Sequence, residues 1–303
     1  MLRFLTPTNP LKPPDPVRRE YVQSISRGFS VIKAFSGRAD GLTISDVAER
    51  TGLSRAASRR FLLTFKELGY VSVEDGYFQL TPRVLDLGFT FLSTMGLPDV
   101  AQSTMEEVVA TVHESCSITV LDGMDIVYVA RVPAKRIMSI ALAVGARLPA
   151  YPTSMGRVLL AGLDPARLER YLSEVVLTPL TTRTVTSKPQ LRRILNQVRE
   201  QGWTIIDQEV EVGVRSVAAP IRDHFGRATA AINISSHASR VTLKVLRTTY
   251  LPVVLRAADH ISSLLGAPPR KKDAESESRL LLPARDSGKA TSQKTPKVGI
   301  PSF

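Results

Sequence analysis

The stretch that decides the fold lies between residues 42 and 80 and reads LTISDVAERTGL (42–53), SRAASRRFLLTFKELGY (54–70) and VSVEDGYFQL (71–80). Thr43 and Asp46 fit a capping box, so a helix should begin at Ile44. Gly52 suits a left-handed helix stop, and only one residue separates it from Ser54, which can cap a second helix. The stretch therefore predicts two helices joined by a tight turn.

The second of these helices should have an apolar face and a polar one. Its buried stripe is predicted from apolar residues that recur every three or four positions: Ala57, Phe61, Phe65 and Leu68. Arg55, Ser58 and Arg59 lie on a different face, near the helix N-terminus. A short helix, a tight turn and a helix with polar and cationic residues in its first two turns form the helix-turn-helix pattern, whose second helix enters the major groove of DNA.

Flanking segments complete this predicted DNA-binding domain. Two strands at 71–73 and 77–80, turned at Asp75 and Gly76, predict a hairpin of the kind called a wing. Upstream, the run that starts at Tyr21 predicts a first helix, whose core-facing residues should be Ile25, Phe29, Ile32 and Phe35. The expected fold of this part is a winged helix-turn-helix.

Charge is distributed unevenly along the 303 residues, a length that suits about two domains. The net charge of +12 favours an anionic partner. Basic residues outnumber acidic ones by 13 to 8 in 1–83, by 19 to 16 in 84–267 and by 8 to 4 in 268–303. The basic excess therefore lies at the two ends, which fits a nucleic-acid-binding head on a body that binds a small molecule.

The sequence argues against several classes of protein and of site. Cys116 is the single cysteine, so we expect no intramolecular disulfide and no cysteine zinc site. The segment His113-Glu114-Ser115-Cys116 lacks the second histidine of a zinc-protease motif. No G-x-S-x-G and no phosphate loop occurs, so we expect neither an enzyme nor a cofactor. The chain has no apolar run of about 18 residues and no signal-peptide pattern, which predicts a cytoplasmic protein without a membrane partner.

The body should have an α+β fold. Helices are expected at 99–112, 154–163, 164–174 and 191–202, with a closing helix at 241–266 broken near Pro252. Strands are expected around a turn at Asp122 and Gly123, and at 137–145, 203–210, 216–221 and 228–235. Strands with helices interspersed are typical of an α+β domain that binds small molecules. The predicted organisation is a disordered lead (1–19), a winged helix-turn-helix (20–83), a linker helix (84–97), an effector-binding domain (98–267) and a disordered basic tail (268–303).

Long strings across 21–267 resemble the IclR family of transcriptional regulators, and within it the branch that controls aromatic-acid and β-ketoadipate pathway catabolism. The strings are YVQSISRGFSVIKAF (21–35), RAASRRFLLTFKELGYV (55–71), LDGMDIVYVARV (121–132), VGARLPAYPTSMGRVLLA (144–161) and EVGVRSVAAPI (211–221). The resemblance implies a winged helix-turn-helix joined by a helix to a GAF-like effector domain. It also implies a homodimer or a dimer of dimers. The proline-rich start and the basic tail fall outside the family pattern.

The candidate DNA contacts lie on the second helix and around it. The first group is Arg55, Ser58, Arg59 and Arg60, because arginine is the commonest bidentate reader of guanine and serine can contact a base or a phosphate. Thr43, Ser54 and Arg38 are further candidates for phosphate contacts. Exposed arginines can also be merely solvated, and capping alone accounts for Thr43 and Ser54.

The first group of candidate effector contacts lies where the predicted helix at 154–163 begins. It comprises Ser154, Met155, Gly156 and Arg157, since a helix N-terminus offers free N–H groups and a positive dipole end to a carboxylate. A capped helix with a glycine for close packing explains the same string, and the resemblance decides for the pocket. Arg147 could pair with a ligand carboxylate or lie at the surface.

The second group comes from strands. Asp207, Glu209 and Glu211 should share one strand face, which more often means solvent exposure. The resemblance implies an acidic pocket residue here, for which Glu209 is the candidate, and a pocket position at Ser216. Strand position alone suggests Tyr128, Met138 and Ser139.

The expected function is a ligand-responsive transcription factor for a catabolic operon of aromatic acids or their β-ketoadipate-pathway intermediates. Its partners would be double-stranded promoter DNA and a small carboxylic acid, with RNA polymerase as a further candidate. Two alternatives remain open: an enzyme domain fused to a DNA-binding head, and a ligand-independent architectural DNA-binding dimer.

Overall fold

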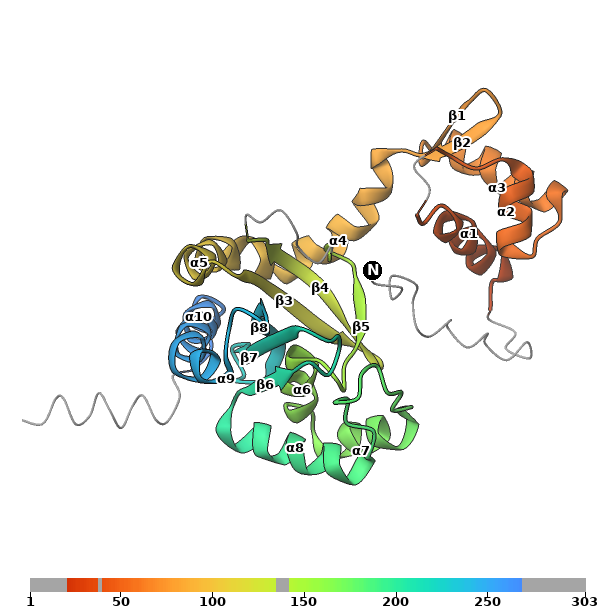
Figure 1. Ribbon diagram of the computed structural model, residues 1–303. Helices are drawn as coiled ribbons and strands as arrows, with labels where there is room; N and C mark the ends of the chain where they lie inside the picture. Colours follow the sequence, from red (N-terminus) through yellow and green to blue (C-terminus); the bar gives the residue numbers. More distant parts are fainter. Residues whose placement is uncertain (1–20, 38–39, 135–141, 269–303) are drawn as a thin grey trace, which may run out of the picture. The chain divides into compact units, whose positions relative to one another are not determined.

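The computed structural model describes residues 21–37, 40–134 and 142–268 (Figure 1). Its N-terminal domain contains the helices α1 (Gln23–Ala34), α2 (Ile44–Thr51) and α3 (Arg55–Glu67). The capping box between Thr43 and Asp46 is present in both directions, and Gly52 ends α2 with φ 68°. Ser54 Oγ accepts the Ala57 N–H at 3.2 Å and so caps α3. These contacts confirm the predicted helix-turn-helix.

The predicted wing is also confirmed. Strands β1 (Val71–Glu74) and β2 (Tyr77–Leu80) pair antiparallel. Asp75 and Gly76 take φ values of 48° and 82°, as the tight turn of a two-residue hairpin requires. Leu42 exchanges two backbone hydrogen bonds of 2.8 Å with Phe78, which ties the segment before α2 to the wing.

Two helix faces of this domain differ from the prediction. Phe35 is buried and Ile32 packs against the same core, as predicted. Ile25 and Phe29, however, are 59% and 52% exposed, and the buried residues within α1 are Gly28 and Val31. A side chain at Gly28 would lie 3.4 Å from Phe65, so the two helices meet at this glycine, and that contact turns Phe29 outward. On α3 the buried line runs through Ser58 and Leu62. The predicted stripe residues Ala57, Phe61 and Phe65 are only half-buried, and Leu68 is exposed.

A short helical turn (η1, Pro82–Val84) and the helix α4 (Leu85–Met95) follow the wing. Gly96 then separates α4 from α5 (Leu97–Val112) with φ 59°. The C-terminal domain is built on one antiparallel sheet of six strands in the order β5-β4-β3-β8-β7-β6. Their bounds are β3 (Ser115–Asp122), β4 (Asp125–Val132), β5 (Arg147–Pro149), β6 (Thr204–Asp207), β7 (Val214–Arg222) and β8 (Ala228–His237). The predicted α+β fold is thus confirmed.

Of the strand predicted at 137–145, residues 137–141 lie outside the described residues and 142–145 form no strand. The edge strand β5 begins only after them.

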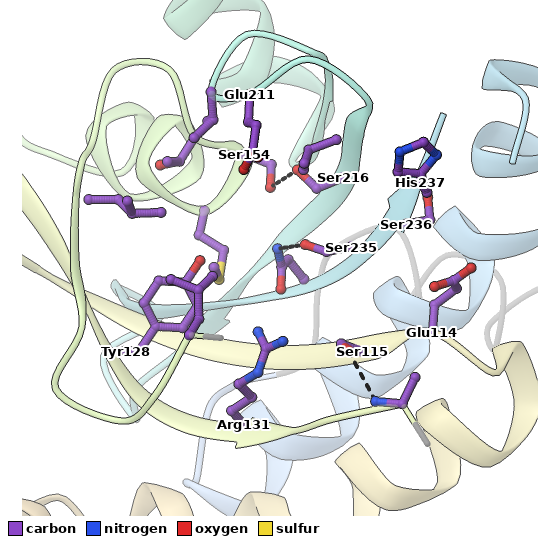
Figure 2. Close-up of a pocket in the computed structure, with 18 of the residues that line it drawn as sticks. Glu114, Ser115, Tyr128, Arg131, Ser154, Glu211, Ser216, Ser235, Ser236 and His237 are labelled. Atoms are coloured by element: carbon purple, nitrogen blue, oxygen red, sulfur yellow. Dashed lines mark hydrogen bonds between the residues drawn. The ribbon is translucent and has the colours of Figure 1, made fainter. Parts of the chain in front are cut away.

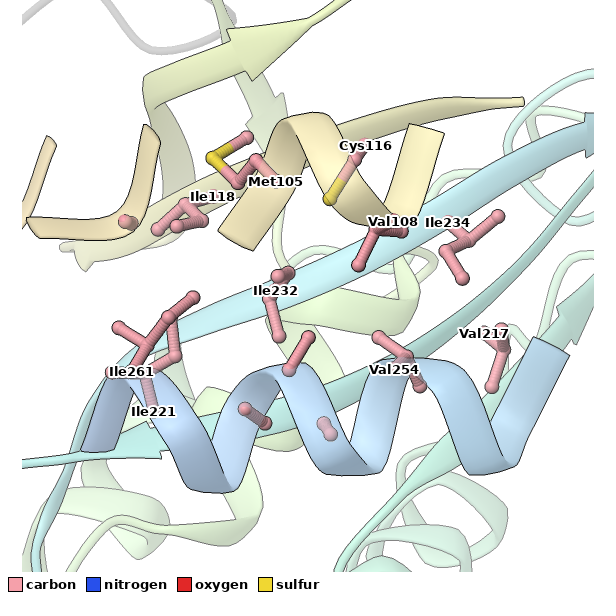
Figure 3. Close-up of a cluster of buried hydrophobic side chains, with 14 of the residues drawn as sticks. Met105, Val108, Cys116, Ile118, Val217, Ile221, Ile232, Ile234, Val254 and Ile261 are labelled. Carbon is pink, nitrogen blue, oxygen red and sulfur yellow. The ribbon is translucent and has the colours of Figure 1, made fainter. Parts of the chain in front are cut away.

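Helices cover both faces of this sheet (Figure 1). One face carries α5 and α10 (Leu251–Leu264) over an apolar core that includes Met105, Ile232, Ile234 and Val254 (Figure 3). Cys116 belongs to this core, and burial raises the pKa of its thiol. The opposite face carries α6 (Ser154–Ala161) and α8 (Lys188–Gln201), with α7 (Pro165–Glu174) between them in sequence.

The closing helical segment is interrupted, as predicted. It consists of α9 (Leu243–Val245), a π-helical turn (η2, Leu246–Tyr250) and α10, whose second residue is Pro252. Within the described ranges, no helix is both long and apolar enough to cross a membrane.

Strand alternation decides which side chains face which helices. On β8, Ile232 and Ile234 pack into the core with α5 and α10, whereas Ala231 packs into the core with α6 and α8. Because successive side chains of a strand point to opposite faces, Asn233 and Ser235 lie on the α6 side. This face holds the cavity described next.

Candidate functional site

A cavity of about 150 Å³ lies on the α6 side of the six-stranded sheet (Figure 2). Its apolar lining comprises Ala134, Leu142, Leu148, Met155, Val210 and Val214. Its polar and aromatic lining comprises Glu114, Ser115, Tyr128, Arg131, Thr153, Ser154, Glu211, Ser216, Asn233, Ser235, Ser236, His237 and Arg240. A dry cavity of about 150 Å³ engineered into another protein binds benzene, so this one has the size for a single aromatic ring.

The floor of the cavity is a row of side chains across neighbouring strands. Arg131 of β4 lies opposite Ser117 of β3, and Ser117 lies opposite Asn233 of β8. Arg131 Nη1 donates to Ser117 Oγ at 3.3 Å, and its side chain reaches into the cavity from β4 (Figure 2). Burial lowers the pKa of the Arg131 guanidinium, because desolvation disfavours the charged form. A bound anion at this position would stabilise that charge.

Polar groups of the walls are arranged for hydrogen bonding. Burial raises the pKa of Tyr128 to about 12, so its phenol stays protonated and can donate. Ser216 Oγ and Ser154 Oγ are 2.8 Å apart and connect β7 to the start of α6. Asn233 Nδ2 donates to Ser235 Oγ at 2.9 Å. Asn233 Oδ1 is buried, and the described part of the chain offers it no hydrogen-bond partner.

Only part of the predicted group at the start of α6 lines the cavity. Ser154 and Met155 line the cavity, whereas Gly156 and Arg157 do not. A Cβ on Gly156 would lie 2.0 Å from the Ala150 carbonyl oxygen, so this glycine serves close packing of α6 on the preceding loop. The Thr153 side chain accepts the Gly156 N–H at 3.0 Å and caps the helix.

Arg157 and Glu209 form a buried ion pair away from the cavity, which corrects the prediction that both contact the effector. Arg157 Nη1 and Nη2 donate to the two Glu209 carboxylate oxygens at 2.8 and 2.6 Å, and Nε donates to the Tyr151 carbonyl at 2.8 Å. Glu209 also accepts the Val185 N–H at 3.1 Å. Arg157 thus uses all three of its side-chain nitrogens inside the protein, and the pair anchors the loop 208–213 that brings Val210 and Glu211 to the cavity wall.

The three acidic residues do not share a face, contrary to the prediction. Strand β6 ends at Asp207, and Gln208 has φ 62°, so alternation stops there. Asp207 pairs with Arg183 and Arg215 outside the cavity. Burial opposes ionisation of Asp207, but hydrogen bonds led by the one from Arg215 outweigh it and lower its pKa.

Arg147 pairs with Asp122 at 2.7 Å and with Asp125 at 3.4 Å, and it does not line the cavity. The predicted positions Tyr128 and Ser216 do line it. Met138 and Ser139 lie outside the described residues.

Several lining residues were missed from the sequence, above all Arg131 and Asn233. The available signal was a polar residue at an inward position of an otherwise apolar strand, as in AAINIS at 230–235. In the sequence, Glu114 and Ser115 stand out only as part of the incomplete zinc motif at 113–116. Where the structure describes the chain, no group of three or more His, Cys, Asp or Glu side chains could hold a metal ion.

The first two turns of α3 present a cationic face. Arg55, Arg59 and Arg60 are exposed, and Arg38 lies outside the described residues. Thr43 Oγ1 and Ser54 Oγ both act as helix caps. Ser58 differs from the prediction: its side chain is 0% exposed, so its hydroxyl does not reach DNA in this structure.

Comparison with known proteins agrees with both parts of this description. A family model described as the IclR helix-turn-helix domain matches residues 24–75. A second model, described as the bacterial transcriptional regulator IclR C-terminal domain, matches residues 89–263. The chain belongs to the IclR family. It is therefore a transcriptional regulator, and the predicted family resemblance is confirmed.

Relatives within the IclR family include a regulator of a Pca regulon and a transcriptional activator of p-hydroxybenzoate hydroxylase. The Pca regulon regulatory protein of Pseudomonas putida is 42% identical over 240 residues, which cover 79% of this chain and 82% of the relative. The p-hydroxybenzoate hydroxylase transcriptional activator of Acinetobacter baylyi is 35% identical over 81% of this chain and 93% of its own length.

Solved structures extend the match to three dimensions. A regulator structure from Rhodococcus sp. RHA1 is 50% identical with a TM-score of 0.75, over 81% of this chain and 98% of that one. An IclR homologue from Microbacterium hydrocarbonoxydans, complexed with 4-hydroxybenzoate, is 25% identical with a TM-score of 0.71, over 80% and 98% of the two chains.

Proposed function

We propose that this IclR-family chain regulates a catabolic operon for aromatic acids or their β-ketoadipate-pathway intermediates, and that its C-terminal cavity binds the small carboxylic acid to which it responds. The observation that carries the proposal is the cavity itself. It has the volume of one aromatic ring, an apolar wall that includes Leu148, Met155 and Val214, and a half-buried arginine in its floor. The relatives named for Pca and p-hydroxybenzoate regulation, and the homologue complexed with 4-hydroxybenzoate, support the same ligand class.

In the proposed complex, Arg131 binds the effector carboxylate. A guanidinium can donate two parallel hydrogen bonds to a carboxylate, and such charge-assisted bonds are stronger than neutral ones. The ring would pack against the apolar wall formed by Leu148, Met155 and Val214. Ser154 and Ser216, which the sequence also predicted, would lie at the edge of the ligand.

The DNA-binding half of the proposal rests on α3 and the wing. Arg55, Arg59 and Arg60 would contact bases and phosphates in the major groove, with Ser54 and Thr43 acting as caps. We further propose that the chain acts in the cytoplasm as a homodimer or a dimer of dimers, which binds promoter half-sites about one helical turn apart. RNA polymerase is a further proposed partner. We also propose that the winged helix-turn-helix domain spans 20–83, the linker helix 84–97 and the effector-binding domain 98–267. The lead and nearly all of the tail lie outside the described residues.

The proposed role is binding without turnover. At the cavity edge, His237 Nδ1 lies 2.7 Å from Ser239 Oγ, but it also accepts the Ser239 N–H at 3.2 Å. This is a local turn contact two residues apart and does not resemble an activated nucleophile oriented by a base.

Thermal unfolding of the full chain tests the proposal. We would measure the midpoint with 4-hydroxybenzoate, protocatechuate and β-ketoadipate, since a ligand at 100 times its Kd stabilises the folded state by about 2.7 kcal/mol. At least one acid should raise the midpoint and be recovered chemically unchanged. A flat panel would contradict the effector proposal, and conversion of the acid would favour an enzyme.

A further inference from the structure

The cavity floor contains a hydrogen-bond acceptor that the protein leaves unused. Asn233 is 3% exposed and lines the cavity. One N–H of its amide donates to Ser235 Oγ at 2.9 Å, while Oδ1 is buried with no donor among the residues that the structure describes. Buried carbonyl oxygens in native proteins are rarely left unpaired, because desolvation without a replacement hydrogen bond is costly. A donor carried by the ligand would complete this group.

The position of Asn233 relative to Arg131 fixes which part of a ligand it meets. The two residues lie on strands that flank β3 and share the same partner, Ser117. Strands in a sheet are about 4.8 Å apart, so their backbones start roughly 10 Å from each other. A carboxylate bound at Arg131 therefore directs the far side of a benzene ring toward β8, where Asn233 lies.

Because Asn233 Oδ1 accepts hydrogen bonds, it favours those candidate acids that carry a hydrogen-bond donor. Carboxylate and ketone oxygens only accept hydrogen bonds at neutral pH, whereas a ring hydroxyl can donate one. Glu114 pairs with Arg240 at 3.4 Å and both line the cavity, whereas Glu211 is in no ion pair among the described residues, so a second ligand carboxylate beside Glu211 would be repelled. Ser236 Oγ is a further unpartnered atom in the described lining, but a hydroxyl can donate or accept and so does not select.

We propose that Asn233 is a specificity-determining residue, whose Oδ1 accepts a hydrogen bond from a ring hydroxyl and so selects hydroxylated aromatic acids. This inference rests on the proposed binding of an organic acid in the cavity. It adds that unsubstituted benzoate and aliphatic keto-dicarboxylates bind more weakly, since each leaves Oδ1 without a donor.

The first test needs no variant. Isothermal titration calorimetry on the full chain would compare the affinities for benzoate, 4-methylbenzoate, 3- and 4-hydroxybenzoate, protocatechuate and β-ketoadipate (3-oxoadipate). At least one hydroxylated acid should bind about tenfold or more tightly than benzoate and 4-methylbenzoate. Equal affinities, or tightest binding by 3-oxoadipate, would overturn the role of Asn233 and leave the effector site intact. Absence of binding by every acid would overturn the proposed function itself.

The second test removes the acceptor. Asn233→Ala should weaken binding of the preferred hydroxylated acid about tenfold or more and should affect benzoate much less, because the contact to a ring hydroxyl exists for the first ligand alone. Thr119→Ala is the matched control: Thr119 Oγ1 is equally buried and unpartnered among the described residues, but Thr119 does not line the cavity. That variant should keep the hydroxyl preference. A preference that survives Asn233→Ala would contradict the inference.

Discussion

Single residues of α3 show how position on a helix separates a binding role from a structural one. Arg55, Arg59 and Arg60 are exposed, whereas Ser58, next to Arg59, is completely buried. Exposed cations near the start of a recognition helix can reach DNA, and a buried hydroxyl cannot.

Replacing Arg59 should weaken DNA binding. Fluorescence anisotropy with a promoter fragment should show a lower affinity for Arg59→Ala than for the unaltered chain. If the contact is to a phosphate, the slope of log K against log salt should also fall by about 0.9. Lys66→Ala, in the last turn of the same helix, is the control and should change affinity less. Unchanged affinity and salt dependence for Arg59→Ala would exclude the assigned face.

Replacing Ser58 should leave DNA binding unchanged. Its Oγ is buried and has no hydrogen-bond partner within the described residues. Ser58→Ala removes that desolvated hydroxyl, so the free energy of unfolding should stay equal or rise by on the order of 1 kcal/mol. Urea denaturation and the same anisotropy assay measure both effects. A large loss of DNA affinity with normal stability would restore Ser58 as a contact.

Residue roles set by neighbours in sequence could be predicted, and those set by distant partners could not. Thr43, Asp46 and Ser54 cap helices through contacts three residues away, which spacing reveals. Arg157 and Glu209 are 52 positions apart, so their pairing inside the protein, and hence their absence from the cavity, could not be read from spacing. The alternation of its strand marks Asn233 as an inward polar residue, but its place across β3 from Arg131 is set by strand register and could not be predicted.

Among the elements, α6 depends on one glycine and one ion pair for its place against the sheet. Helix periodicity and caps predicted where α6 begins, because those signals are local. Which side of it faces the cavity depends on packing against Ala150 and on the loop that carries Glu209. The buried face of α1 likewise could not be predicted from periodicity, because it is set by the contact with α3 at Gly28.

Gly156→Ala should displace α6. The added methyl would lie 2.0 Å from a backbone oxygen and 2.5 Å from a Cα of Ala150, neither of which can move easily. Overpacking of this kind costs about 1–3 kcal/mol, and effector binding should be lost with it. Gly88→Ala is the control in α4, where no described atom beyond its chain neighbours and the helix's own backbone lies within 4 Å of the new methyl. That change should be neutral or stabilising by about 0.5–1 kcal/mol. Equal stability of the two variants would contradict the packing role.

Arg157→Ala should destabilise the domain strongly. The pair is buried, and removing one partner leaves the other charge uncompensated at a cost of about 3–5 kcal/mol. Arg192→Ala breaks the exposed pair with Glu169 and should leave the unfolding midpoint nearly unchanged. Thermal unfolding of both variants measures the contrast. If Arg157→Ala were stable but unable to bind any acid, a direct effector contact would be supported instead.

At the scale of the whole molecule, the chain joins a DNA-binding domain to a ligand-binding domain, an arrangement that the IclR family models match over residues 24–75 and 89–263. A ligand can shift a regulator between two states only through different affinities for them. By linkage, an acid that changes DNA affinity is itself bound with a different affinity when DNA is present. The cavity and the cationic face of α3 should therefore be coupled.

The most direct measurement is the affinity of the full chain for its promoter DNA, with and without a saturating aromatic acid, in the unaltered protein and in Arg131→Met. We expect the acid to change DNA affinity by roughly fivefold or more in the unaltered chain, within the usual range of allosteric coupling. In Arg131→Met the acid should have no effect, while DNA affinity without acid stays the same. Identical DNA affinity and footprint with and without a bound acid would contradict a coupled regulator, and an undiminished response in Arg131→Met would contradict the cavity as its origin.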